Sequence, residues 1–394
     1  MGDNVNMNMT VESFGTTSQG MEITMYRLET ASVRLGIIDY GTTLVSLCVK
    51  DKDGEWQDIV LGYDNVHEYE NDADNNMGCN MGRCVNRIAG GHFVLDGVEY
   101  QLECNDGENT IHSGSDAYCR RKWTYVDSDE TSVTFVLNSR DGDQGFPGNL
   151  LVYVTYRFLS DNKFEIEYEG TPDKDTIINM TNHSYFNLNG EGNGKIYDHK
   201  LVIYADSFTP SGKDAIPTGE IRSVDKTPMD YRSGKTIGQD INTDYEQLLN
   251  ANGYDHNWIT VESCTNNACT VDSCIGNTCM VDTCTGNSCK DNSYAECSCQ
   301  DNSCELHRIV EVTGDISGIH MTIETDYPGM QMYTGNFISN ERRGVKGKNG
   351  HIYSERDGVC FEPQYYPDAI NHKNFISPVC RAGKRFNKRI VYTF

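Results

Sequence analysis

The chain has 394 residues, of which 37% are hydrophobic, so it is long enough to bury a sizeable core. It carries 33 Lys and Arg against 58 Asp and Glu, a formal net charge of −25. Such a surface repels phosphate backbones, so we expect no nucleic-acid partner. The sequence has no run of 18 apolar residues, and its first ten residues, MGDNVNMNMT, lack the basic and apolar parts of a secretory signal. We therefore expect no membrane span and a cytoplasmic location.

Strict alternation of apolar and polar residues predicts strands in chain order at 133–137, 151–158, 164–169 and 319–323. In the third of these, Phe164, Ile166 and Tyr168 alternate with glutamates, which predicts a half-buried strand with an acidic solvent face. Turn signals such as Asp53-Gly54 and Asp96-Gly97 separate the patterns. Only residues 245–249 suggest a helix, of one or two turns. Many short strands with little helix predict an all-β antiparallel sandwich or barrel.

One stretch departs from this pattern. Nine of the 16 cysteines lie between Cys264 and Cys304, in tandem decapeptides that begin CTNNACTVDS, CIGNTCMVDT and CTGNSCKDNS. The stretch has almost no large apolar side chains and is unable to form a core of its own. We interpret residues 262–305 as a Cys-rich surface insertion between two neighbouring strands of a single domain that spans residues 1–394.

Three interpretations of the insertion remain open. Cysteines at regular spacing fit disulfide rungs in a small solenoid or hairpin, which requires an oxidising compartment. Thiolate binding of a metal is a second interpretation, although a five-residue spacing is not that of a zinc site. The third is an expanded low-complexity loop without a catalytic role. The other seven cysteines are scattered, as expected of thiols in a reducing compartment.

Residues capable of acid–base chemistry gather next to turns in a few segments. These segments are GRCVNRIAGG at 82–91, NTIHSG at 109–114, TNHSYFNL at 181–188, GYDHN at 253–257 and FEPQYYPDA at 361–369. Further segments are DQGFPG at 143–148, IPTGE at 216–220, TPMDYR at 227–232 and PGMQMYTGNF at 328–337. Together and in this order, from about residue 15 to residue 394, they resemble the aldose 1-epimerase (galactose mutarotase) family.

The resemblance implies a large antiparallel β-sandwich that binds one small-molecule hexose in an open cleft, with no cofactor and no metal. Matched by motif, His183 of TNHSYFNL is expected to be the general acid that faces the ring oxygen. Glu362 of FEPQ is expected to be the general base that faces the C1 hydroxyl. The implied substrate ligands are Asn86, Arg87, His112, Asp255 and Gln331.

The implied activity is interconversion of the α and β anomers of free hexoses such as galactose and glucose. The C1–O5 bond breaks, the aldehyde rotates, and the ring closes on its other face. Ring opening removes a proton from O1 and delivers one to O5, so it needs one base and one acid. A carboxylate and an imidazole suit these two tasks at neutral pH.

Two other functions remain open at this point. The first is a non-catalytic carbohydrate-binding protein on the same fold, which would have no need for a matched acid and base. The second is a hexose-6-phosphate 1-epimerase, which would need additional Arg or Lys at the rim of the cleft. Whether the protein is a monomer or a homodimer is undecided by the sequence.

Overall fold

The structure is a computed structural model that describes residues 7–71, 74–260, 305–339, 341 and 344–394. Its strands form antiparallel sheets, of which the three largest have nine, six and five strands. The expected all-β class is therefore confirmed, and the arrangement is a large β-sandwich. In the part of the chain that is described, no helix is long and apolar enough to cross a membrane.

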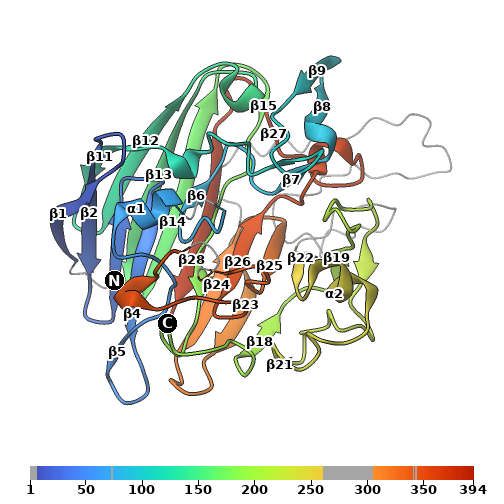
Figure 1. The fold of residues 1–394 in the computed structure, drawn as a ribbon. Coiled ribbons are helices and arrows are strands. Elements are labelled where there is room, and N and C mark those ends of the chain that lie inside the picture. The colour runs from blue at the N-terminus through green and yellow to red at the C-terminus, as the bar shows by residue number, and fades with distance from the viewer. Residues whose placement is uncertain (1–6, 72–73, 261–304, 340, 342–343) are drawn as a thin grey trace, which may run out of the picture.

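The largest sheet has the strand order β11-β12-β13-β14-β28-β24-β23-β18-β21. In chain order its strands are β11 (Thr124–Ser128), β12 (Ser132–Ser139), β13 (Leu150–Ser160), β14 (Lys163–Pro172), β18 (Lys200–Ile203), β21 (Lys235–Thr236), β23 (His307–Thr313), β24 (His320–Thr325) and β28 (Phe386–Thr393). The long strands β12–β14 and β28 run through the middle of Figure 1. β28 pairs with both β14 and β24, so it joins the two halves of this sheet.

The five-stranded sheet follows the chain from β1 to β5 in order. Its strands are β1 (Asn8–Thr16), β2 (Glu22–Glu29), β3 (Val33–Ile38), β4 (Thr43–Lys50) and β5 (Trp56–Asp58). The six-stranded sheet has the order β17-β26-β25-β22-β19-β20. Its strands are β17 (Tyr185–Phe186), β19 (Ser207–Thr209), β20 (Arg222–Ser223), β22 (Asp255–Ile259), β25 (Gly329–Tyr333) and β26 (Val359–Gln364).

Four two-stranded pairings and a few short helices complete the described elements. The pairings join β6 (Asn80–Met81) to β16 (Thr181–Asn182), β7 (Arg87–Ile88) to β10 (Thr110–Ile111), β8 (His92–Leu95) to β9 (Val98–Gln101), and β15 (Thr176–Ile177) to β27 (Val379–Cys380). The α-helices are α1 (Val66–Asn71) and α2 (Glu246–Ala251). Short 3-10 turns lie at Ala89–Gly91, Tyr118–Arg120, Asp143–Gly145, Lys348–Gly350 and Ala369–Asn371.

All three large sheets contribute to one buried hydrophobic cluster. Leu35 and Leu47 enter it from the five-stranded sheet, Val152 from the nine-stranded sheet, and Met332 and Phe361 from the six-stranded sheet. Each of these side chains is the apolar member of an alternating pattern, because successive side chains of a strand point to opposite faces. This shared core fixes the six-stranded sheet firmly against the rest of the sandwich.

The four expected strands are present, and the expected helix corresponds to α2. The sequence predicts that the acidic face of β14 is exposed to solvent, but one of its glutamates is buried. Glu165 is only 4% exposed, because the guanidinium of Arg157 on β13 lies 2.6 Å from its carboxylate and compensates for its burial. The helix α1 was not predicted, since its six residues are too few to show a helical period.

The predicted Cys-rich insertion lies almost wholly outside the described residues, so its three interpretations stay predictions. The strands on either side of it are described. β22 pairs with β19 and β25 in the six-stranded sheet, whereas β23 pairs with β18 and β24 in the nine-stranded sheet. The prediction that the insertion joins two neighbouring strands is therefore wrong, because the chain passes there from one sheet to another.

Candidate active site

Polar side chains gather on one face of the six-stranded sheet, which we call the site face. Residues directly opposite each other in an antiparallel pair share a face, and so do alternate residues of one strand. Across β22, β25 and β26, Asn257, Gln331 and Glu362 lie opposite one another in one row of the sheet. Asp255, Tyr333 and Cys360 form the next row on the same face. The site face is thus made of Asp255, Asn257, Gln331, Tyr333, Cys360, Glu362 and Gln364.

The sequence of β26 explains why Glu362 lies on this face. Val359 and Phe361 belong to the shared hydrophobic core, so the period of two turns Cys360 and Glu362 to the opposite side. The apolar members of the strand therefore fix the orientation of the polar members. Glu362 is only 2% exposed, although it carries an ionisable group.

His183 meets the site face from the segment between β16 and β17. Its backbone N–H donates to the carbonyl of Cys79 at 2.9 Å, and its own carbonyl accepts from Gly78 at 2.9 Å. The side chain is buried, and its Nε2 lies 3.8 Å from Oε2 of Glu362. An imidazole and a carboxyl group that are 179 positions apart in the sequence thus meet in one place.

The other ring nitrogen of His183 faces a thiol. Sγ of Cys360 lies 3.5 Å from Nδ1, and burial raises the pKa of this thiol well above its usual range. The thiol therefore keeps its hydrogen and is a neutral hydrogen-bond partner of Nδ1. The contact holds the imidazole so that its Nε2 faces Glu362.

Burial shifts the two central groups in opposite directions. It lowers the pKa of His183 to about 4. It raises the pKa of Glu362 well above its ordinary value, and the nearby charge of Asp255 raises it further. Both shifts favour the uncharged form, because ionised groups are poorly solvated in the protein interior. Burial therefore shifts both members of the pair toward their neutral forms.

His112 packs against the ring of His183, and Asn86 hydrogen-bonds to His112. The rings of His112 and His183 are 5.6 Å apart at an angle of 72°. The backbone N–H of Asn86 donates to Nδ1 of His112 at 3.3 Å, and the backbone N–H of His112 donates to the carbonyl of Asn86 at 3.1 Å. Both residues have positive φ, 64° for Asn86 and 52° for His112, which marks locally strained backbone.

Asp255, Gln331 and Arg87 form the remaining part of the predicted set. The amide of Gln331 donates to Oδ1 of Asp255 at 2.7 Å. Burial raises the pKa of Asp255, and the positive charge of Arg87 opposes that rise. Arg87 itself donates to Asp106 at 2.7 Å. The structure therefore brings all seven sequence-predicted site residues together around His183 and Glu362.

Several buried polar atoms of the site face have no hydrogen-bond partner among the described residues. They are Oδ1 of Asn257, Oε1 of Gln331, Oε2 of Glu362 and both amide atoms of Gln364. Buried polar groups are otherwise nearly always paired, so such a concentration marks a place built to receive polar groups from outside the chain. A hydroxyl-rich ligand offers donors and acceptors to each of these atoms.

His183, Cys360 and Glu362 also have the residue types of a metal site. Their ligand atoms lie within 4.8 Å of one another. The sequence analysis expected no metal. The same three side chains already form a chain of contacts from thiol to imidazole to carboxyl, which suits proton transfer.

Sequence reasoning missed part of the site face. Cys360, Tyr333, Asn257 and Gln364 were not predicted, although the last three lie in segments that were singled out and Cys360 directly precedes one. For Cys360 and Gln364 a signal was available, since both stand two residues from Glu362 and share its face if the segment is a strand. Tyr333 and Asn257 require the pairing of β25 with its neighbours, which the sequence does not display.

Comparison with known proteins gives one consistent result. A family model described as aldose 1-epimerase matches residues 24–393. A galactose mutarotase from Sus scrofa is 33% identical over 390 residues, covering 98% of this chain and 99% of that protein. An aldose 1-epimerase from Escherichia coli is 30% identical, covering 94% and 95%. The solved structure of an aldose epimerase homologue from C. elegans superposes with a TM-score of 0.74 at 27% identity, covering 98% of each chain.

Proposed function

This chain belongs to the aldose 1-epimerase family and is an isomerase, and we propose that it interconverts the α and β anomers of free galactose and glucose. The observation that carries the proposal is the contact between His183 Nε2 and Glu362 Oε2 at 3.8 Å, on a buried face with unpartnered polar atoms. O1 and O5 of a pyranose are both bonded to C1, so the acid and the base that serve them must lie within a few ångströms of each other.

In the proposed mechanism the carboxylate of Glu362 removes the proton from O1 while protonated His183 delivers a proton to O5. The electrons of the O1–H bond form the aldehyde carbonyl, and the C1–O5 bond breaks. Glu362 then carries a proton and His183 is neutral. After rotation about C1–C2 the two groups reverse their roles and the ring closes on the other face. Each positioned group contributes roughly 10²–10⁴-fold to the rate.

The pKa shifts bear directly on this scheme. The pair holds one proton both before ring opening, as carboxylate and imidazolium, and after it, as carboxylic acid and imidazole. Burial raises the free energy of the ionised arrangement relative to the neutral one, as the lowered pKa of His183 and the raised pKa of Glu362 indicate. The buried environment therefore favours the forward proton transfers of ring opening.

The surrounding residues are proposed to hold the sugar. Gln331 and Asp255 already bond each other, which leaves Oε1 of Gln331 and Oδ2 of Asp255 to face the hydroxyls. His112, Asn86 and Arg87 come from other segments of the chain and are proposed to bind the same sugar. Several ligands around the acid–base pair would fix the ring so that C1 stays next to it.

An unphosphorylated sugar fits this set of residues better than a hexose 6-phosphate. Arg87 is the only cation among the seven predicted residues, and its guanidinium is already paired with Asp106 at 2.7 Å. A phosphate dianion needs cations that are free to pair with it. Asp255 and Glu362 are acidic residues, so they supply no positive charge to pair with a dianion.

Polarimetry of freshly dissolved α-D-galactose and α-D-glucose tests the proposal. Wild type should speed the approach to the equilibrium rotation, and His183→Ala should reduce kcat by roughly 10²–10⁴-fold. His320→Ala serves as a matched control, because His320 is exposed on β24 of the other sheet. This control should keep the wild-type rate.

Two outcomes would decide against the proposal. If wild type binds galactose but relaxes its rotation no faster than buffer, the protein is a carbohydrate-binding module. If α-D-glucose 6-phosphate is turned over with a higher kcat/KM than α-D-glucose, the substrate is the phosphorylated sugar. We also propose a cytoplasmic location, which the seven free cysteines of the described chain support.

A further inference from the structure

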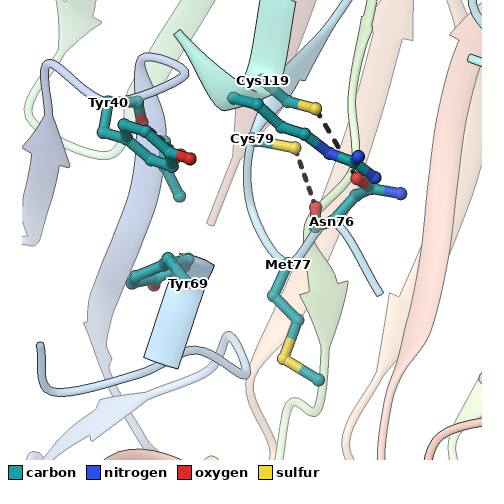
Figure 2. A pocket seen from close by; sticks show the side chains of 8 residues that line it. Tyr40, Tyr69, Asn76, Met77, Cys79 and Cys119 are labelled. Atoms are coloured by element: carbon teal, nitrogen blue, oxygen red, sulfur yellow. Dashed lines mark hydrogen bonds between the residues drawn. The ribbon is translucent and has the colours of Figure 1, made fainter. Parts of the chain in front are cut away.

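A small cavity lies beside Cys79, whose backbone carbonyl accepts from the N–H of His183. It has a volume of about 20 Å³ and is lined by Tyr40, Thr43, Tyr69, Asn76, Met77, Cys79, Cys119 and Arg120. Figure 2 shows the two cysteine side chains next to each other on its wall, both directed toward Asn76. Cys79 and Cys119 come from separate parts of the chain, one just before β6 and the other in the turn Tyr118–Arg120.

The two thiols share their surroundings closely. Sγ of Cys79 donates to the backbone carbonyl of Asn76 at 3.0 Å, and Sγ of Cys119 donates to the side-chain carbonyl of the same residue at 3.6 Å. The two cysteines are 4% and 5% exposed, so the cavity is their route to small molecules. Because both thiols lie beside Asn76 and next to each other, side-chain rotation can bring their sulfurs toward the roughly 2.05 Å of an S–S bond.

The pair is chemically asymmetric. The neighbouring Cys79 thiol lowers the pKa of the Cys119 thiol, and the positive charge of Arg120 lowers it further. Burial raises the pKa of the Cys79 thiol well above its usual range. A thiolate is the nucleophilic form of cysteine, so Cys119 is suited to attack first and Cys79 to respond. Cys84 serves as a comparison for Cys119. Burial raises the pKa of the Cys84 thiol, and Cys84 does not line this cavity.

We propose that Cys79 and Cys119 form an oxidation site, at which hydrogen peroxide converts the two thiols into an intramolecular disulfide. The cavity volume of about 20 Å³ admits a molecule little larger than water. It excludes bulky oxidants such as glutathione disulfide. The proposal is independent of the proposed isomerase mechanism. Both thiols hydrogen-bond to Asn76, and neither of these bonds joins them to the side chain of His183 or Glu362.

The chemistry balances in two steps. The Cys119 thiolate attacks one peroxide oxygen, the O–O bond breaks, and hydroxide leaves and takes up the thiol proton as water. Cys119 is then a sulfenic acid. Cys79 attacks the Cys119 sulfur, the S–O bond breaks, and a second water departs with the Cys79 proton. The two thiols lose two electrons and the peroxide gains them.

Peptide mapping of the peroxide-treated full chain tests the proposal. Cleavage after Lys, Arg and Glu separates Cys79, Cys84, Cys104 and Cys119 into different peptides, since Arg83, Arg87, Glu103 and Glu108 lie between them. After blocking of free thiols, we expect Cys79 and Cys119 to disappear in equal amounts. A cross-linked peptide that is two hydrogens lighter than its parts should replace them. The same peptide should be absent after treatment with glutathione disulfide.

Single variants assign the order of events. In Cys79→Ser the sulfenic acid on Cys119 cannot be resolved, so a 1,3-dione probe should label Cys119. In Cys119→Ser, Cys79 should react as slowly as the buried Cys84. The proposal is overturned if Cys79 and Cys119 stay as reduced as Cys84 in wild type while the exposed Cys104 is consumed. It is equally overturned if peroxide treatment of urea-unfolded protein gives the same yield of this cross-link.

Discussion

Two buried glutamates of this protein have opposite surroundings. Glu191 is 8% exposed and its carboxylate is fully engaged, with Nδ2 of Asn349 at 2.8 Å, Nδ1 of His351 at 3.0 Å and the hydroxyl of Tyr353 at 2.7 Å. Glu362 is 2% exposed, yet its Oε2 has no hydrogen-bond partner among the described residues. Both carboxyl groups are withdrawn from water, but the protein supplies partners to only one.

This difference separates a structural carboxylate from a reactive one. Burying a carboxylate without hydrogen bonds destabilises a protein, so the arrangement around Glu362 persists at a cost to stability. Such a cost is typical of sites where the missing partner comes from a substrate. Glu191, in contrast, stabilises the segment that contains Tyr353. Replacing each glutamate in turn by glutamine tests whether Glu362 is reactive and Glu191 structural.

The largest effect is expected from Glu362→Gln, which removes the base and keeps the shape. We expect kcat for galactose to fall by roughly 10²–10⁴-fold. The same substitution should raise the stability of the protein at neutral pH. In the unfolded chain this carboxyl ionises near 4.5, whereas in the folded chain its pKa is raised. Its favourable contribution is therefore complete below pH 4.5 and is lost as pH rises through the folded pKa.

Glutamine cannot ionise, so Glu362→Gln should melt at a higher Tm than wild type at pH 7 and at the same Tm near pH 4. Differential scanning calorimetry at the two pH values measures this. A lower Tm at pH 7 would show that the carboxylate of Glu362 is structurally satisfied, like that of Glu191.

The second effect is the pH dependence of kcat. Catalysis needs one proton on the His183–Glu362 pair, so activity should be flat while the pair holds one. With the pKa of His183 lowered to about 4, a second proton binds only near that pH, below the 6.5 of an ordinary histidine. Below it, kcat should fall about tenfold per pH unit. A stopped-flow polarimetric profile from pH 3.5 to 9 tests this, and an acid limb near 6.5 would contradict it.

The third effect concerns stability alone. Glu191→Gln places an amide group where the carboxylate accepted hydrogen bonds, so at least one of Asn349, His351 and Tyr353 loses its acceptor. We expect a loss of about 1–3 kcal/mol in the free energy of unfolding. Urea titration followed by tryptophan fluorescence measures it, and kcat at 25 °C should match wild type. A large drop in kcat with unchanged stability would reverse the assignment of the two glutamates.

The smallest effect is expected at Cys360. Cys360→Ala removes the thiol that hydrogen-bonds with Nδ1 of His183, so the imidazole loses a contact that orients it. A weak hydrogen bond of about 1 kcal/mol corresponds to roughly a five-fold loss of kcat. Cys360→Ser keeps a donor and should retain more activity than alanine. Equal activity of the two variants would mean that the thiol only fills space.

Much of the fold could be predicted, because alternation reports directly which side of a strand is buried. β13 and β14 were predicted on that basis, and their apolar members do belong to the core. Burial of Glu165 could not be predicted, since it depends on Arg157 lying beside it on the neighbouring strand. The prediction that β22 and β23 are neighbouring strands was wrong for the same reason, because strand pairing depends on residues far apart in the sequence.

The candidate site likewise has residues that local sequence predicts and contacts that it does not. His183 and Glu362 were predicted because each stands in a distinctive segment, and the register of β25 with β26 then aligns Gln331 with Glu362. The contact of Cys360 with His183, and that of Cys79 with Cys119, were not predicted. Each joins residues from separate strands or turns, whose meeting is decided by the packing of sheets and not by either local sequence.

The place of β28 between β14 and β24 has a consequence for how the protein is made. On a ribosome, β11 to β14 and β18 to β24 are synthesised long before residues 386–393. Until that last strand arrives, β14 and β24 each present an unpaired edge, the kind of surface that recruits foreign strands. An aggregation-prone stage of the nascent chain therefore ends only when β28 closes the sheet.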